Sequence, residues 1–416
     1  MRSELLKDLE WRGLVNDCTD RENLDEVLES QSISLYCGVD PTGDSMHIGH
    51  LLPFLVLKRF QNAGHKPIVL VGGATGTIGD PSGKSAERSM QTFDVVRHNV
   101  ECLTGQLKSL FGDDAQFVNN YDWTSNLSVL DFLRDFGKSF NLNQMIAKET
   151  VKARLETGIS FTEFSYQILQ SMDFNHLYEF FDCKLQIGGS DQWGNIVSGL
   201  DLIRKKQSED AKAFGLTLPL VTKSDGTKFG KTETGAIWLD AKKTSPYEMY
   251  QFFINTADAD VVRFLKYFTF LSKEQISEIE VQFSDAPHER LAQKTLASEV
   301  VTLIHGEEAK GQAIKISNAL FSGDVANLDA SEIEVGFKDV PSISVSEDLG
   351  LIDLLVMSGA ASSKREAREF IQNNSISVNG VKQNDLEFVA KKSDAIDGSF
   401  TVLRRGKKKY FLVGHE

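Results

Sequence analysis

With 416 residues, the chain is longer than one hydrophobic core usually supports, so two or three domains are expected. Hydrophobic residues make up 41% and charged residues 25%, which is typical of a folded globular protein and excludes a fibre or a disordered chain. The net charge of −14 would argue against a nucleic-acid partner, but from Glu347 onward 11 Lys or Arg stand against 10 Asp or Glu, which leaves −15 for the first 346 residues.

The N-terminal segment and the cysteines indicate a location. Residues 1–13 mix charges with leucines, and the densest apolar stretch, residues 51–57, is far shorter than a membrane span. Cys18, Cys37, Cys102 and Cys183 lie far apart without a Cys-x-x-Cys pair, which suits neither a zinc site nor a disulfide framework. We therefore expect a reduced, cytoplasmic protein with no membrane partner and no metal held by protein ligands.

Three predicted strands each run into a polar or glycine-rich loop. The strand and loop pairs are 32–39 with 40–46, 67–71 with 72–83, and 184–187 with 188–192. The first loop leads into a predicted helix at 49–60. Strands that alternate with helices predict a parallel α/β sheet with its ligand site at the carboxyl ends of the strands.

The remaining segments predict further domains. About a hundred residues with helical periodicity separate the second strand from the third, which is too long for one crossover and predicts an insertion. The predicted divisions are a catalytic domain at 1–222 with a helical insertion at about 100–183, a mobile loop and connector at 223–243, a helical domain at 244–321, a linker at 322–346 and a C-terminal α+β module at 347–416.

Two histidines follow the first strand in the sequence Asp40-Pro-Thr-Gly-Asp-Ser-Met-His47-Ile-Gly49-His50. Imidazoles near a helix N-terminus, beside a glycine that admits a ligand to the backbone, can hold a phosphate chain. A random His-x-x-His is more often an ordinary loop. In this context, however, the motif resembles the ATP-binding motif of class I aminoacyl-tRNA synthetases.

A second motif, Lys228-Phe229-Gly230-Lys231-Thr232, resembles the mobile KMSKS loop of that family in the form typical of its tyrosyl members. Two lysines at this spacing can converge on pyrophosphate oxygens after the loop closes. An isolated Lys-x-x-Lys is usually a solvated surface turn. The presence of both motifs reverses that expectation.

The segment 79–85 nearly matches a phosphate-binding P-loop, but it has three residues between its glycines where four are required. Pro81 also removes an N–H group from the cradle. A kinase built on this loop is therefore a weak third alternative. Gly73, Gly76 and Gly79 are spaced three apart, which also fails the dinucleotide fingerprint.

A polar stripe of Tyr166, Gln170 and Asp173 shares one face of the predicted helix 161–181. By pattern alone, this stripe would more often face solvent. The resemblance implies instead a tyrosine site, in which Tyr36 and Asp173 bind the phenol hydroxyl. It also implies that Asp80, Tyr166 and Gln170 bind the ammonium group and that Gln192 lies near the reacting carboxylate.

The resemblance further implies an ATP site and a reaction. Its nucleotide contacts are Cys37, Gly38, Asp40, Gly49, Gly189, Asp191 and Lys231. Thr42, His47 and His50 would face Lys228 and Lys231 across the phosphates of ATP bound with Mg²⁺. The carboxylate of L-tyrosine attacks the α-phosphate without a protein nucleophile, and the tyrosyl group then passes to tRNA(Tyr).

The family likeness covers nearly the whole chain. It implies a Rossmann-like catalytic domain, a homodimer through the insertion, and a C-terminal RNA-binding module. Its candidate RNA contacts are Lys364, Arg365, Arg368, Arg404, Arg405, Lys407, Lys408 and Lys409. The alternatives are a tryptophanyl-type synthetase, whose substrate has no hydroxyl for Asp173, and a non-catalytic RNA-binding homologue, which the intact histidines and lysines oppose. Basic hairpins are also often only soluble sheet edges.

Overall fold

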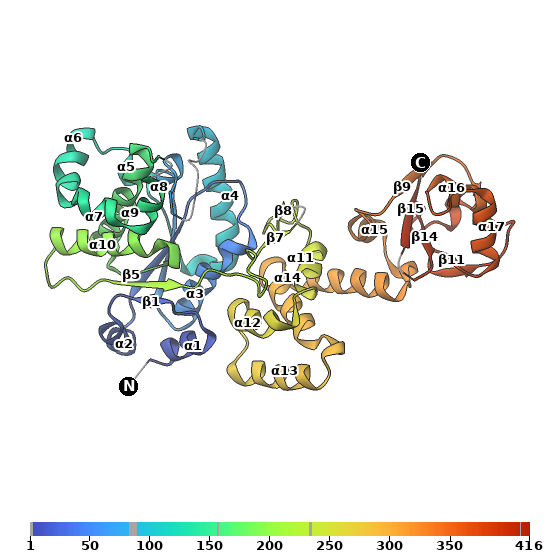
Figure 1. Ribbon diagram of the computed structural model, residues 1–416, viewed down its shortest axis with the longest axis horizontal. Coiled ribbons are helices and arrows are strands. Elements are labelled where there is room, and N and C mark those ends of the chain that lie inside the picture. Colours follow the sequence, from blue (N-terminus) through green and yellow to red (C-terminus); the bar gives the residue numbers. More distant parts are fainter. Residues whose placement is uncertain (1–2, 83–89, 156–157, 233–234, 408) are drawn as a thin grey trace. The chain divides into compact units, whose positions relative to one another are not determined.

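A computed structural model describes residues 3–82, 90–155, 158–232, 235–407 and 409–416 (Figure 1). For residues 149, 150, 153, 231 and 232 it describes the backbone alone. The chain divides into two compact units, which are treated separately below. The first comprises Met1–Lys243 with Ala257–Ala292, and the second comprises Thr244–Thr256 with Gln293–Glu416.

A six-stranded sheet forms the centre of the first unit, with the strand order β1-β6-β5-β2-β3-β4. Neighbouring strands are parallel except for β1 and β6, which are antiparallel. β3 is buried beyond its first residue, as an apolar strand of a covered parallel sheet should be. The predicted parallel α/β fold is confirmed. The strands are β1 (Asp17–Cys18), β2 (Ser34–Val39), β3 (Lys66–Val71), β4 (Gln116–Asn119), β5 (Cys183–Gly189) and β6 (Phe214–Leu218).

Helices pack against this sheet, and α9 (Phe161–Phe181) occupies the range predicted for it. Ser160 caps its start by accepting a hydrogen bond from the Glu163 N–H group. Gly199 of α10 allows close packing, because a Cβ atom there would lie 3.0 Å from the Phe174 ring. The other helices are α1 (Glu4–Arg12), α2 (Arg21–Ser30), α3 (Leu51–Asn62), α4 (Phe93–Phe111), α10 (Trp193–Lys206), α12 (Asp258–Phe268) and α13 (Lys273–Asp285).

The helical insertion is shorter than the predicted range of about 100–183. Residues 93–111 form α4, and β4 then pairs with β3, so the sheet continues to Asn119. β4 has only two adjacent apolar residues, Phe117 and Val118, and therefore gave no strand pattern. The insertion proper contains α5 (Tyr121–Thr124), α6 (Val129–Asp131), a π-helical turn (Phe132–Phe136), α7 (Leu142–Ala147) and α8 (Glu149–Leu155).

The second unit combines helices with a five-stranded sheet of the order β12-β11-β14-β15-β9. The predicted hairpin turn has positive φ angles of 48° at Asn379 and 86° at Gly380, and a second turn passes through Gly406 at 64°. The elements are α11 (Pro246–Ile254), α14 (Leu291–Ser322), α15 (Ala330–Gly336), β9 (Ser342–Val345), β10 (Leu349–Gly350), α16 (Leu351–Met357), α17 (Lys364–Gln372), β11 (Ile376–Val378), β12 (Val381–Gln383), β13 (Val389–Ala390), β14 (Phe400–Arg405) and β15 (Lys409–His415).

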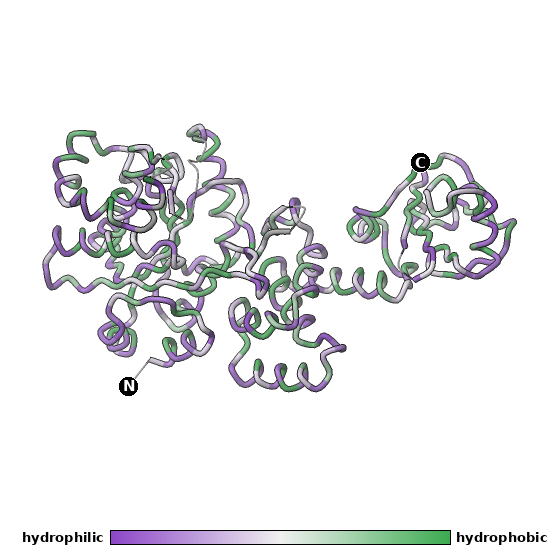
Figure 2. The backbone as a smooth tube through the Cα atoms, viewed as in Figure 1, coloured by the Kyte–Doolittle hydropathy of each residue, from purple (hydrophilic) through white to green (hydrophobic). Residues whose placement is uncertain are grey.

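The structure differs from the expectation of a linker at 322–346. This segment contains α15, which begins at a capping box of Asp329 and Glu332, and β9, which pairs in parallel with β15. Both elements are short and keep polar residues on their exposed faces, so their composition resembles that of a loop. Longer amphipathic helices are easier to recognise, as Figure 2 shows for the alternating hydrophobic and hydrophilic residues of α13.

Candidate active site

A cavity of about 300 Å³ lies where β2 and β5 end. β2 has β3 on one side and β5 on the other, so the loops that leave these strands diverge and open a crevice. Most residues predicted to bind tyrosine or ATP line this cavity. They are Tyr36, Cys37, Gly38, Asp40, Thr42, His50, Asp80, Tyr166, Gln170, Asp173, Gly189, Asp191 and Gln192.

Tyr36 and Asp173 supply deeply buried polar groups to the wall, each 2% exposed. The Asp173 carboxylate accepts hydrogen bonds of 2.9 Å from Trp123 Nε1 and from Asn120 Nδ2. Burial raises the pKa of Asp173 to about 7, and these two hydrogen bonds oppose that rise. The Tyr36 hydroxyl is buried without a hydrogen-bond partner in the described part of the chain. A ligand hydroxyl can satisfy both residues, because it accepts from Tyr36 and donates to Asp173.

The polar stripe of α9 faces the cavity and not the solvent. Tyr166 is buried, and its hydroxyl donates a 2.8 Å hydrogen bond to Asp40. Burial raises the pKa of Tyr166 well above its usual range, and Asp40 and Asp80 add to that rise. Gln170 is half-buried in the same wall. The stripe therefore forms one wall of the cavity.

A network of amides surrounds the buried carboxylate of Asp80. Gln192 Nε2 donates to Asp80 over 2.7 Å, and Gln170 Nε2 donates to Gln192 Oε1 over 3.2 Å. Asn195 Nδ2 then donates to Gln170 Oε1 over 3.0 Å. An anionic group held in this way offers a site for a ligand ammonium group.

Glycines let two further carboxylates approach the backbone beside the cavity. A Cβ atom at Gly72 would lie 2.3 Å from Asp40 Oδ1, and one at Gly189 would lie 2.6 Å from Asp191 Oδ1. Thr75 also donates a 2.7 Å hydrogen bond to Asp40. Burial raises the pKa of Cys37 to about 12, so this lining thiol stays neutral.

The two histidines of the first motif stack on each other. Their ring centroids lie 3.7 Å apart with an interplanar angle of 21°. His47 Nδ1 accepts a 3.1 Å hydrogen bond from the Gly49 N–H group, which caps a short 3-10 turn (Ile48–His50) before α3. His50 reaches the cavity, and His47 lies directly beside it.

The lysine motif lies directly against the histidine motif. Ile237 O accepts a 2.8 Å hydrogen bond from Ile48 N, and Gly230 O accepts one of 3.1 Å from Ile237 N. Gly230 has a φ angle of 80°, and a Cβ atom there would lie 2.7 Å from Ile48. Phe229 anchors the segment between Phe264 and Phe268, with centroids 4.7 and 4.9 Å away. The two motifs are therefore adjacent.

The structure describes the side chain of Lys228 but only the backbone of Lys231. Lys228 is exposed, and its backbone forms an isolated antiparallel β-bridge with Thr222. Lys231 begins a two-stranded hairpin of β7 (Lys231–Thr232) and β8 (Gly235–Ala236), and its side chain lies outside the described part of the structure.

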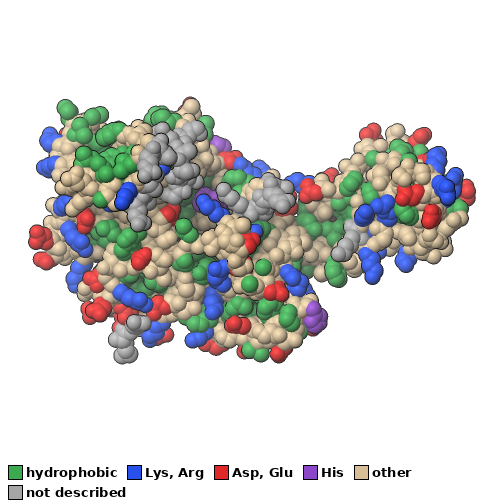
Figure 3. Space-filling view, in the orientation of Figure 1, with side chains coloured by type: hydrophobic (Ala, Val, Ile, Leu, Met, Phe, Trp, Pro, Cys, Tyr) green, Lys and Arg blue, Asp and Glu red, His purple; other side chains and the backbone are tan. Residues whose placement is uncertain are grey.

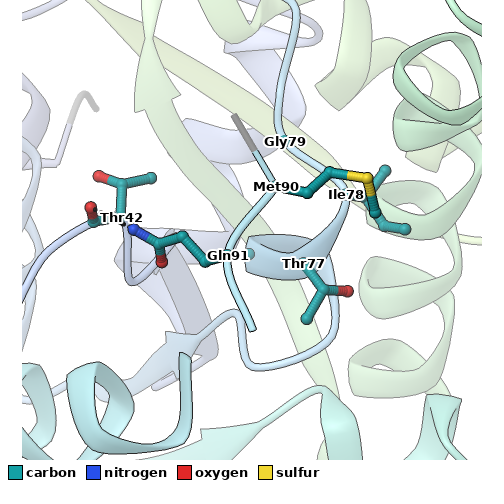
Figure 4. Close-up of a pocket in the computed structure, with 7 residues that line it drawn as sticks. Thr42, Thr77, Ile78, Gly79, Met90 and Gln91 are labelled. Atoms are coloured by element: carbon teal, nitrogen blue, oxygen red, sulfur yellow. Dashed lines mark hydrogen bonds between the residues drawn. The ribbon is translucent and has the colours of Figure 1, made fainter. Parts of the chain in front are cut away.

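A smaller side pocket shares Thr42 with the main cavity (Figure 4). Gln91 Nε2 donates a 3.1 Å hydrogen bond to Thr42 O, and Asn99 Nδ2 donates one of 3.0 Å to Pro41 O. These amides fix the loop that carries Asp40 and Thr42. The P-loop-like segment passes beside this pocket, and its residues from 83 onward lie outside the described ranges.

The basic residues of the C-terminal module fall into two groups. Arg404 Nη1 donates to Ser322 O over 3.2 Å, and Arg405 Nη1 donates to Ala360 O over 2.5 Å, so both half-buried arginines also bind within the fold. Lys364 is exposed and lies 2.6 Å from Asp353. The other exposed candidates are Arg365, Arg368, Lys407 and Lys409, and Lys408 lies outside the described residues.

Several residues of the site were not predicted. Asn120 and Trp123 hold Asp173, Asn195 joins the Asp80 network, and Gln186 lines the cavity with a buried Oε1 atom that has no partner among the described residues. Gln186 carried a usable signal, because a polar residue inside an apolar strand is unusual. Asn120 and Trp123 lie in short, weakly patterned segments, and Asn195 is a single polar residue of α10, so these three gave no signal.

Metal clusters and membrane helices are both absent from the described ranges. No group of three or more His, Cys, Asp or Glu side chains there has the arrangement of a metal site. No helix among those residues is long and apolar enough to cross a membrane.

Comparison with known proteins identifies the family of this chain. Residues 28–322 match the family of tRNA synthetases class I (W and Y). Residues 332–413 match the tyrosine–tRNA ligase SYY-like C-terminal domain. The chain therefore belongs to the class I tRNA synthetases of the tryptophan and tyrosine group, as its two motifs predicted.

Similar proteins narrow this membership. A tyrosine–tRNA ligase of Listeria innocua is 62% identical over 418 residues, covering 99% of this chain and 100% of that protein. Tyrosine–tRNA ligase 1 of Bacillus cereus is 62% identical over 415 residues, covering 98% and 99%. A C-terminally truncated mitochondrial tyrosyl-tRNA synthetase of Aspergillus nidulans has a TM-score of 0.70 at 36% identity, covering 77% of this chain and 95% of that one. Within the class, the chain belongs to the tyrosine–tRNA ligases.

Proposed function

We propose that this chain activates L-tyrosine with ATP and transfers it to the 3′ end of tRNA(Tyr), using the cavity described above. The observation that carries this proposal is the pairing of two buried polar groups in one wall, the Asp173 carboxyl and the Tyr36 hydroxyl, which has no partner among the described residues. A phenol hydroxyl can accept from Tyr36 and donate to Asp173, whereas phenylalanine would leave the Tyr36 hydroxyl without a partner and add no donor to Asp173. An unsatisfied buried group costs about 1–3 kcal/mol, which favours tyrosine over phenylalanine.

The amino group of tyrosine binds on the opposite side of the same amino-acid site in this proposal. Asp80 supplies the negative charge, and Tyr166 and Gln170 complete the contacts. Gln192 hydrogen-bonds both Asp80 and Gln170, so it orients the site next to the reacting carboxylate. Held there, the carboxylate attacks the α-phosphate without help from a protein base, because it is already the nucleophile.

The nucleotide occupies the glycine-lined part of the cavity. Cys37, Gly38, Asp40, Gly49, Gly189 and Asp191 are its proposed contacts. Thr42, His47 and His50 meet the triphosphate from one side, and Lys228 and Lys231 meet it from the other. Positive charge from both sides stabilises the departing pyrophosphate, which leaves with the Mg²⁺ that accompanied ATP.

The assembly and the RNA partner complete the proposal. Large apolar side chains are exposed on the insertion and at the start of α9, including Val129 at 73%, Leu130 at 76% and Phe161 at 72%, and hydrophobic side chains gather over this region in Figure 3. Such a patch favours a homodimer that covers it.

The exposed cations of α17 and of the β14–β15 turn favour contact with tRNA phosphates. Four free cysteines favour the reducing cytoplasm.

The experiment is tyrosine-dependent ATP–pyrophosphate exchange, measured in parallel with tryptophan and phenylalanine. We expect exchange with tyrosine that exceeds the other two by at least about tenfold in kcat/KM, from the cost of unsatisfied groups. Equal exchange with tryptophan, or none with tyrosine, would remove this proposal.

A further inference from the structure

A continuous series of contacts leads from the molecular surface to the stacked histidines. Lys243 Nζ pairs with the Asp44 carboxylate and lies 5.2 Å from the centroid of the Trp238 ring. Trp238 in turn meets His47 edge-on, with centroids 6.1 Å apart and an interplanar angle of 64°. His47 then stacks on His50, which lines the cavity.

The backbone brings these side chains together by pairing two segments of the first unit. Residues 237–239 run antiparallel to residues 46–48, with hydrogen bonds of 2.8 Å from Ile48 N to Ile237 O and from Leu239 N to Met46 O. An isolated bridge places Trp238 directly opposite His47. The chain segment that carries Trp238 is therefore the continuation of the hairpin that carries Lys231.

A turn then brings Lys243 back over the indole ring. Asp240 stabilises it, because its carboxylate accepts a 2.9 Å hydrogen bond from Lys242 N and its carbonyl accepts one of 3.0 Å from Lys243 N. Ser45 Oγ also accepts a 3.2 Å hydrogen bond from Asp240 N. Gln106 of α4 holds the segment that carries Ser45 and Met46. Its Nε2 donates a 2.9 Å hydrogen bond to Ser45 Oγ, and its Oε1 accepts one of 3.0 Å from Met46 N.

The contacts are directional enough to fix a ring position. An ammonium group over an indole face is attracted to its negative electron density, and the paired Asp44 keeps that ammonium in place. The indole ring then limits where the neighbouring imidazole can lie, while His50 bounds one face of that imidazole. The backbone pairing holds the Trp238 main chain, and displacing Lys243 would remove a side-chain contact that orients its ring, which is one boundary of His47.

We propose that Lys243 is a positioning residue for the activation step: together with Asp44, it holds Trp238 against His47 and so fixes His47 for its contact with the ATP triphosphate. This inference rests on the proposed role of His47 in ATP activation. Lys243 itself need not touch ATP. The same contacts join the segment that leads into the histidine motif to the segment that follows the lysine hairpin.

The test compares Lys243→Gln, Asp44→Asn and Lys243→Arg in the full chain. We measure kcat and KM for ATP in tyrosine-dependent pyrophosphate exchange, and tyrosine affinity by equilibrium binding. Lys243→Gln should lower kcat about tenfold with tyrosine affinity unchanged, because small misplacements of a catalytic group have effects of this size. Asp44→Asn should lower kcat in the same direction, because it removes the charge that keeps Lys243 in place. Lys243→Arg should recover most of the rate, since Arg retains the charge, the Asp44 pairing and the ring contact.

Lys184→Gln is the matched control. Lys184 also pairs with an aspartate, Asp182 at 2.7 Å, and lies 4.7 Å from an aromatic centroid, that of Tyr178. It should leave kcat unchanged. If Lys243→Gln behaves like this control, or if it weakens tyrosine binding in step with kcat, the positioning role is wrong. Absence of exchange in the unsubstituted chain would instead refute the proposed function.

Discussion

Asp173 is the residue that we propose selects the substrate most directly. Its side chain is 2% exposed, and burial raises its pKa to about 7. The carboxylate accepts a hydrogen bond more strongly than the protonated acid does. Tyrosine affinity should therefore increase as the pH rises from about 6 to about 8.

Asp173→Asn tests this dependence. Loss of a charge-assisted hydrogen bond should weaken tyrosine binding by about 1.5–3 kcal/mol, and the remaining affinity should no longer change with pH in this range. The measurement is calorimetric titration with tyrosine at several pH values. Asp182→Asn, at the exposed end of the same helix, is the control and should keep the pH dependence. An unchanged profile in Asp173→Asn would mean that another group titrates.

At the residue scale, sequence reasoning found the side chains that line the cavity better than the side chains that support them. Tyr36, Asp80 and Asp173 come from motifs with a recognisable pattern, and all line one cavity. Trp123 and Asn120 contact Asp173 from about fifty positions away in the chain. Such pairs depend on how the insertion packs onto α9, which no local pattern encodes.

We predict that activation depends on the lysine hairpin. Lys231→Ala should slow adenylate formation far more than it weakens tyrosine binding, because the proposed lysine contact strengthens only as pyrophosphate departs. Single-turnover rates and tyrosine affinity, measured on the same preparation, separate these two effects. Equal losses in both would show that the loop acts before the transition state.

Gly230 provides a second test of the same element. A Cβ atom there would lie 2.7 Å from Ile48, and the φ angle of 80° disfavours alanine. Gly230→Ala should therefore push the hairpin away from the histidine motif and reduce the activation rate, measured by pyrophosphate exchange, about tenfold or more.

Gly226→Ala is the matched control for backbone strain. Gly226 has a φ angle of 82°, but a Cβ atom at this position would have no neighbour within 4 Å among the described residues. It should retain most of the activity. Equal losses in both variants would show that backbone strain, and not contact with Ile48, limits the rate.

At the element scale, helices and strands with a clear sequence pattern were predicted most accurately. The helix at 161–181 and the strands at 34–39 and 66–71 carry clear periodicity or continuous apolar runs, and they fold within two residues of their predicted limits. β4 and β9 have four residues each, which is too few for a period to emerge. Long-range pairing with β3 and β15 makes them strands.

At the scale of the whole molecule, we predict that the exposed cations of the C-terminal module serve tRNA charging and not tyrosine activation. Replacing the exposed cations Arg368, Lys407 and Lys409 together with Gln should leave pyrophosphate exchange unchanged and raise KM for tRNA in the charging reaction. The salt dependence of charging should also become shallower, because fewer phosphates are neutralised. Lys382→Gln, on an exposed strand of the same sheet, serves as a single-charge control. Unchanged charging in the triple variant would refute this RNA contact.

The two compact units divide the chain differently from the predicted domains. Helices α12 and α13 belong to the unit with the parallel sheet, whereas α11 and most of α14 belong to the unit with the C-terminal module. Sequence alone grouped these helices because they follow one another. Packing between distant segments, such as Phe229 against Phe264, decides their assignment.

The central proposal is that substrate choice depends on a phenol hydroxyl bound between Tyr36 and Asp173. The most direct measurement is a crystal structure of the chain with a non-hydrolysable tyrosyl-adenylate analogue. We predict that the phenol oxygen lies within hydrogen-bonding distance, about 2.5–3.0 Å, of both the Tyr36 hydroxyl and the Asp173 carboxylate. An analogue bound with its ring outside this cavity, or with its phenol oxygen contacting neither residue, would contradict the proposed site.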